Sequence, residues 1–208
     1  MIEILTASLF SSIILLTFGN IFQKFVFNQN IYTNENFSEN SIFGIIFLSL
    51  LTLIINFILP INKVLGNIVC IISLLFFLIF FFNSKYKKKI TYFLILTTVI
   101  TFFLITLSFI NRPDAGLYHL PYTRLINENK IILGASNIHF RFGHISIVQY
   151  LSGIYNNSFF PTSFITVPLA SITSIFIVYL INKFYDLFEE KNNLALIIFL
   201  LLIFSLYS

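Results

Sequence analysis

Five long apolar segments dominate this sequence of 208 residues. A helix needs about 20 consecutive apolar residues to cross the ~30 Å hydrocarbon layer of a bilayer. Because lipid cannot hydrogen-bond to the backbone, each segment that crosses it must be helical. The segments cover residues 4–22, 42–59, 64–82, 90–110 and 162–181. The sequence therefore predicts an all-α fold, a polytopic transmembrane helical bundle.

The composition supports a membrane protein and excludes an ordinary soluble domain. Hydrophobic residues make up 58% of the chain and charged residues only 10%, whereas soluble domains carry about 25% charged residues. A sixth apolar segment starts at Leu194 and reaches Ser208, the last residue. Since this segment is shorter than a full crossing, we expect the chain to be the N-terminal part of a longer protein.

The expected organisation has three parts. Residues 1–110 hold four transmembrane helices, residues 111–161 form a long loop with two short interfacial helices, and residues 162–208 hold the fifth helix and the start of a sixth. The turn "NSKYKKK" (83–89) carries four lysines, and lysine-rich short loops favour the cytoplasm. We therefore expect loop 111–161 on the periplasmic face of a bacterial inner membrane, and the lysines to interact with anionic lipid headgroups.

The loop begins with a charged stretch, "NRPDAGLYHLPYTRLINENK" (111–130). Asp114 can cap a helical turn that starts at Ala115. Pro121 disfavours helical angles at the residue before it. The sequence therefore predicts one turn over 115–119, a bend at Leu120, and a second helix from Pro121 towards Asn129.

The second half of the loop, "GASNIHFRFGHISIVQYLSGIYNN" (134–157), places His139, Arg141 and His144 ahead of a helical apolar pattern. This pattern is typical of a helix that lies flat in the headgroup region. The two histidines are five residues apart, which is not the i, i+4 spacing of a helical zinc pair, so we expect no metal site there. The sequence also lacks a P-loop and a dinucleotide-binding motif, and nothing in it indicates a nucleic-acid partner.

Taken together, the motifs resemble a known superfamily. "DAGLYHLPYTRLINENKI" followed by "FGHISIVQYLSGIYNN" resembles the first external loop of the GT-C superfamily of polytopic glycosyltransferases. "DAGLYHLP" followed by "LGASNIHFRFG" is similar to the same loop in a group of bacterial membrane proteins. The resemblance covers about residues 105–205. The chain differs from the superfamily pattern in that its loop follows the fourth predicted span and not the first.

The resemblance implies transfer of a sugar from a polyprenyl-phosphate donor to an acceptor at the external membrane face. The loop acid Asp114 would be the catalytic base, or it would bind a metal ion or the acceptor, and His119 would share in proton transfer. The implied substrate-binding residues are Arg112, Tyr118, Arg124, His139, Arg141 and His144. The expected partners are the lipid bilayer and a lipid-linked sugar donor. No cofactor is specified, and a divalent metal is left open.

Plainer interpretations stay open beside this one. Asp114 can be a helix cap alone, and Tyr118 can be an aromatic anchor at the membrane surface. The alternative function is that of a non-catalytic polytopic membrane protein, either a transporter subunit or an assembly factor for surface polysaccharide. Transporters place ionisable residues near the middle of their spans. The five predicted spans contain essentially none, which disfavours a transporter.

Overall fold

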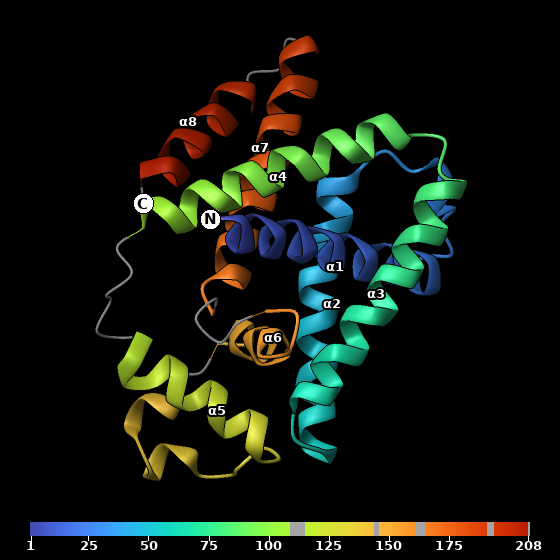
Figure 1. Cartoon of the computed structure of the whole chain (residues 1–208). Helices are drawn as coiled ribbons and strands as arrows, with labels where there is room; N and C mark the ends of the chain where they lie inside the picture. Colours follow the sequence, from blue (N-terminus) through green and yellow to red (C-terminus); the bar gives the residue numbers. More distant parts are fainter. Residues whose placement is uncertain (109–114, 144–145, 161–164, 191–193, 208) are drawn as a thin grey trace.

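The computed structural model describes residues 1–108, 115–143, 146–160, 165–190 and 194–207. Within these ranges the chain is helical with no strand, which confirms the predicted all-α fold. Among the described residues, five helices are long and apolar enough to cross a membrane, as an integral membrane protein requires. They are α1 (Ile2–Val26), α2 (Phe37–Ile58), α3 (Lys63–Asn83), α4 (Lys87–Leu107) and α7 (Val167–Glu189) (Figure 1).

Most of the observed helices extend beyond one or both ends of the apolar segments that predicted them, although α7 begins at Val167 and not at residue 162. Helix α2 begins at Phe37, five residues before the apolar segment starts at 42, and α7 continues past residue 181 to Glu189. The last segment forms α8 (Leu194–Tyr207), which packs against α7. Polar end residues join these helices because backbone hydrogen bonding continues where the chain leaves the apolar layer.

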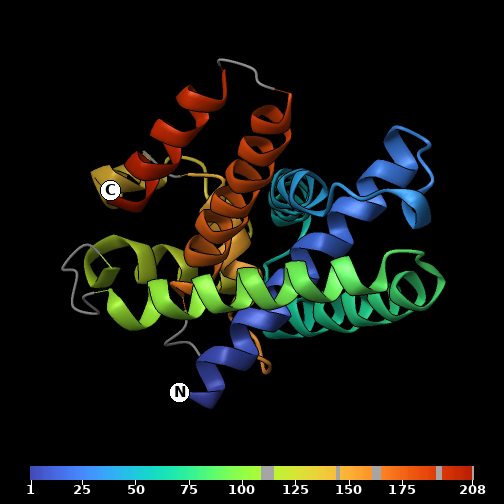
Figure 2. The same ribbon diagram turned by 90° about the horizontal axis from the view of Figure 1, so that it is seen from above.

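Helix α1 is the centre of the bundle. It packs against α2, α3, α4 and α7, and Figure 2 shows it crossing the molecule between them. In α1 about 61% of the most apolar 18 residues are buried inside the protein, whereas in α3 the share is 28%, so α3 faces outward. The closest approach is to α2 at Gly19 and Gly44, where an added Cβ would overlap the carbonyl oxygens of Asn40 and Leu15 respectively. Small residues allow this close helix packing.

Two short helices of the long loop complete the fold. Helix α5 (Leu120–Glu128) packs on α6 (Val148–Tyr155), and α6 in turn contacts α2, α3 and α7. The Tyr155 hydroxyl lies 2.8 Å from the Ser11 hydroxyl of α1. Most of α6 is buried, so this part of the loop belongs to the core of the bundle.

The loop and the lysine-rich turn lie at opposite ends of the bundle. Asn56, in the last turn of α2, donates hydrogen bonds to the carbonyls of Ile126 and Asn129. Beyond the start of the same helix, Glu35 forms an ion pair with Lys89 of α4. The hydrogen bond of Glu35 to Lys89 is the main reason that the pKa of this carboxyl is lowered. We call these the loop end and the lysine end.

Candidate functional site

The first element of the site is a π-helical turn, η2 (Ala115–His119), which runs directly into α5. The predicted bend at Leu120 is wrong, because Leu120 is the first residue of α5 and His119 has right-handed helical angles. Pro121 falls in the first turn of α5, where a helix does not need the missing N–H. The predicted helix towards Asn129 is otherwise confirmed, since α5 ends at Glu128. His119 is therefore held in a continuous helical segment.

His119 is positioned by a side chain of α6. Its Nδ1 lies 2.7 Å from Nε2 of Gln149. In the assigned orientation the amide nitrogen donates and Nδ1 accepts, which puts the proton of a neutral ring on Nε2. Gln149 is only 9% exposed, and its Oε1 has no hydrogen-bond partner among the described residues. If the amide were flipped, Oε1 would accept from Nδ1 and the ring Nε2 would become a base.

Arg141 brings the second half of the loop to this histidine. Its guanidinium carbon lies 4.8 Å from the ring centroid of Tyr118, a cation–π distance. The Tyr118 ring in turn lies 4.3 Å from the His119 ring, centroid to centroid. Arg141 belongs to the 3-10 turn η4 (Phe140–Gly143) and is exposed. The structure therefore brings together three predicted site residues, His119, Tyr118 and Arg141.

Aromatic side chains of α5, α6 and η4 pack next to this group. The hydroxyls of Tyr122 in α5 and Tyr150 in α6 lie 3.0 Å apart in a buried contact. The Phe142 ring lies 5.5 Å from Tyr122 and 5.3 Å from the His139 ring. Burial, together with the hydrogen bond to Tyr150, raises the pKa of Tyr122. The two hydroxyls thus form a hydrogen-bonded pair that joins α5 to α6.

Asn127 fixes the same two helices to the rest of the bundle. Its side-chain nitrogen donates to the Gly153 carbonyl of α6 at 2.9 Å and also to the Ile61 carbonyl in the turn between α2 and α3. Its oxygen accepts from Asn156 at 2.8 Å. Because α5, α6 and this turn meet at one amide, Asn127 joins the site to the loop end of the bundle.

The whole chain matches one protein family. Residues 1–208 match the model of DUF8201, which is described as a domain of unknown function. The chain belongs to the DUF8201 family. No curated protein and no solved structure matches it. A family description of this kind names no activity, so the function of this DUF8201 chain has to be argued from its site.

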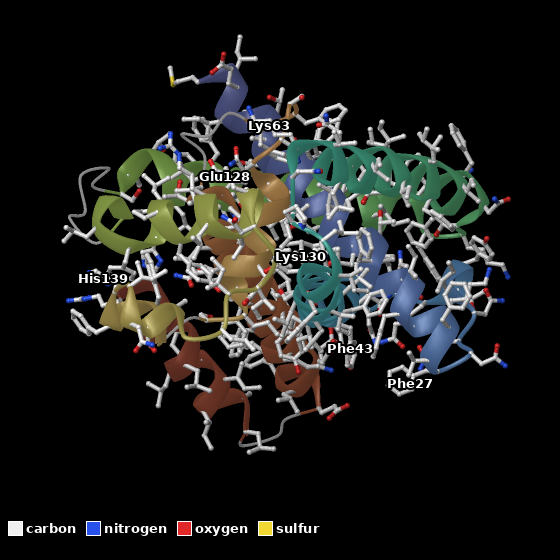
Figure 3. All side chains as sticks on the ribbon, turned by 90° about the horizontal axis from the view of Figure 1, so that it is seen from below. Phe27, Phe43, Lys63, Glu128, Lys130 and His139 are labelled. Carbon is white, nitrogen blue, oxygen red and sulfur yellow. The ribbon has the colours of Figure 1, made fainter. Side chains whose placement is uncertain are left out.

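The other predicted site residues of this DUF8201 chain have different outcomes. The His139 ring packs against the Phe142 ring, and Figure 3 labels His139 on the loop segment next to α5. Arg124 lies on the exposed face of α5. Its role stays a prediction. Arg112, Asp114 and His144 lie outside the described residues.

The metal expectation remains open for the same reason. Within the described ranges, no group of three or more His, Cys, Asp or Glu side chains could hold a metal ion. Asp114 and His144 are outside those ranges, so a site that uses them is not tested.

Gln149 and Asn127 were missed by the sequence reasoning. Asn127 begins the polar run "NENK", which reads as a surface segment, and Gln149 is a single amide in an otherwise apolar stretch. The one available signal was the position of Gln149 within the apolar stretch "ISIVQYLSGIY". A polar side chain on the buried side of such a helix needs a partner, although the sequence does not say which one.

Proposed function

We propose that this protein is a glycosyltransferase that moves a sugar from a polyprenyl-phosphate donor to an acceptor at the membrane surface. The observation that carries the proposal is the meeting of His119, held by Gln149, with Arg141, stacked on Tyr118, at one end of a membrane bundle. A guanidinium and an imidazole together offer N–H donors suited to phosphate oxygens. The resemblance of the loop to GT-C enzymes supports the same substrate class.

The proposed reaction divides the work between three side chains. Arg141 and the Nε2–H of His119 donate hydrogen bonds to the donor phosphate, where negative charge grows as the bond from the sugar C1 to the phosphate oxygen breaks. That oxygen leaves with the bonding electron pair as polyprenyl phosphate. The acceptor hydroxyl oxygen forms the new bond to C1 and gives its proton to the carboxylate of Asp114, the role that the loop resemblance assigns to this acid.

The membrane position of the site is part of the proposal. We place the chain in a bacterial inner membrane, with the loop end on the periplasmic side and the lysine end in the cytoplasm. The support is the cluster of lysines in the α3–α4 turn, because such residues are retained on the cytoplasmic side. A lipid-linked donor presents its phosphate at the membrane surface, which is the level at which the loop end would lie.

Reconstituted vesicles test the activity directly. The purified full chain is mixed with polyprenyl-phosphate donors that carry radiolabelled hexoses, and the release of polyprenyl phosphate is followed. The wild type should release it, and Asp114→Asn and His119→Ala should lower the rate by at least about 100-fold. Lys130→Gln, which changes an exposed residue at the same end, serves as the control and should keep the wild-type rate.

Two results would overturn the proposal. Wild-type rates in Asp114→Asn and His119→Ala would remove the assigned chemistry. No release from any donor by folded wild-type protein would favour the alternative of a non-catalytic assembly factor or transporter subunit. Folding is checked with Cys70, the single cysteine, which is fully buried and reacts with a thiol dye only when the bundle opens.

A further inference from the structure

A cavity lies at the lysine end of the bundle, at the opposite end from the loop site. It is enclosed by α1, α3 and the 3-10 turn η1 (Ile31–Thr33), and it measures about 120 Å³. Its walls are mainly apolar, with Ile21 from α1 and Phe76 and Ile79 from α3. The polar residues that line it are Thr17, Asn20, Lys24 and Tyr32.

Asn20 ends a chain of three hydrogen-bonded amides. Asn34 donates to Oδ1 of Asn40 at 3.2 Å, and Asn40 donates to Oδ1 of Asn20 at 2.8 Å. Each amide in such a chain donates through its nitrogen and accepts through its oxygen, so the direction of the first two bonds leaves the nitrogen of Asn20 as the last donor. Asn20 is 2% exposed, and this nitrogen has no partner among the described residues.

A buried donor without an acceptor is costly, so the free amide nitrogen calls for a ligand oxygen. Thr17, the nearby hydroxyl, already donates to the Ser73 carbonyl at 3.4 Å. An acceptor for the Asn20 nitrogen has to reach below the rim of a mainly apolar cavity. An ester carbonyl fits this requirement, because it accepts hydrogen bonds and carries an acyl chain.

The rim of the cavity is basic. Lys24 is exposed and lies four residues, about 6 Å along the helix, beyond Asn20 towards the end of α1. The backbone N–H of Lys85 donates to the Tyr32 carbonyl at 3.2 Å, which brings the lysine-rich α3–α4 turn beside the same rim. A phosphate at this level would face Lys24, with Lys85 close by.

We propose that this cavity binds an anionic glycerophospholipid of the surrounding leaflet. Its phosphate contacts Lys24, its ester carbonyl accepts a hydrogen bond from Asn20, and the first part of one acyl chain lies against Ile21, Phe76 and Ile79. The volume holds only that part of the chain. The rest continues along the outward-facing side of α3, where Ile72 and Phe76 are 40% and 47% exposed.

Native mass spectrometry of the purified full chain tests this site with phosphatidylglycerol as the probe. The wild type should retain one phosphatidylglycerol as the collision energy rises. Lys24→Gln removes the charge, and Ile79→Trp fills the cavity from an exposed position. Each variant should reduce the retained fraction at least fivefold. Lys63→Gln, an exposed lysine at the loop end, is the matched control and should retain the lipid as the wild type does.

The ester contact is tested separately with an ether-linked phosphatidylglycerol, which has the same headgroup and no carbonyl. The ether lipid should be retained several-fold less than the ester lipid. Equal retention of the two, or a polyprenyl phosphate that displaces the ester lipid at equal concentration, would overturn the assignment of a glycerophospholipid. Equal retention by wild type, Lys24→Gln and Ile79→Trp would overturn the site itself.

Discussion

Nε2 of Gln149, in α6, lies 2.7 Å from Nδ1 of His119, at the end of η2. The contact joins two segments that are 30 residues apart in the sequence. The contact holds the imidazole ring beside Tyr118, on whose ring Arg141 stacks. Gln149 carries no charge. Gln149 is therefore a positioning residue of the proposed transferase site, and it acts through His119.

Replacing Gln149 with Leu should lower the proposed sugar transfer by about 10- to 100-fold, because small displacements of a reacting group cost rates of this order. The loss should appear in kcat with little change in KM for the donor, and the pH profile of kcat should shift. A merely structural role would lower the yield of folded protein and leave the pH profile unchanged. Gln29→Leu, an exposed glutamine outside the site, is the control.

The contact between α1 and α2 predicts a large effect of a single methyl group. Gly44→Ala should lower the free energy of unfolding by about 1–3 kcal/mol, since the new Cβ would overlap the Leu15 carbonyl and push the helices apart. The measurement is the temperature at which a thiol dye reaches half reaction with Cys70 in detergent. Gly116→Ala is the control, because no described atom lies within 4 Å of its added Cβ. Equal midpoints for the two variants would contradict the packing.

Asn127 should matter more for stability than its neighbour Asn129. Asn127→Ala removes hydrogen bonds to the Gly153 and Ile61 carbonyls and to Asn156. Each polar group left buried without a partner costs about 1–3 kcal/mol. Asn129→Ala loses one exposed bond to the Leu125 carbonyl at 3.3 Å and should change stability by less than about 0.5 kcal/mol. The same Cys70 assay compares them, and similar losses in both variants would argue against the Asn127 network.

The five spans were predictable from the sequence because length and apolarity alone decide them in a bilayer. The path of the chain from His119 to Pro121 was not. Whether Pro121 interrupts a helix or begins one depends on where the helix starts, and the fold places Pro121 in the first turn of α5. Local preference predicted a break at Leu120, whereas the π-helical turn over Ala115–His119 continues into α5 without one.

The candidate site was predictable only in part. Tyr118, His119 and Arg141 were found because their residue types suit the chemistry of the resembling loop. Gln149 and Asn127 were not found because their partners, His119 and Gly153, are far away in the sequence. Long-range pairs of neutral amides leave no periodic signal, so only the three-dimensional fold identifies them.

Titration should show Tyr122 as a protected tyrosine. Its pKa in the folded chain is raised, above an unfolded value of about 10. The stability that comes from the neutral hydroxyl is thus complete below about pH 10 and is lost as the pH rises through the folded pKa. Between about pH 10 and pH 11, native Tyr122→Phe and native wild type should show equal tyrosinate absorbance. After denaturation the variant should fall short by one of the ten tyrosines. A native difference of the same size would contradict the burial.

The orientation of the bundle gives a prediction that also bears on the proposed function. Lys88, in the first turn of α4, and Lys130, just past α5, are both exposed and lie at opposite ends. Cysteines placed at these positions should react differently with a membrane-impermeant maleimide in intact spheroplasts. Lys130→Cys should be labelled from outside, and Lys88→Cys only after the membrane is permeabilised. The wild type, whose Cys70 is buried, should stay unlabelled and is the control.

Labelling of both variants from the same side would contradict the opposite placement of the two ends. Labelling of Lys88→Cys alone from outside would reverse the bundle, and it would put the proposed transferase site where a periplasmic lipid-linked donor cannot reach it.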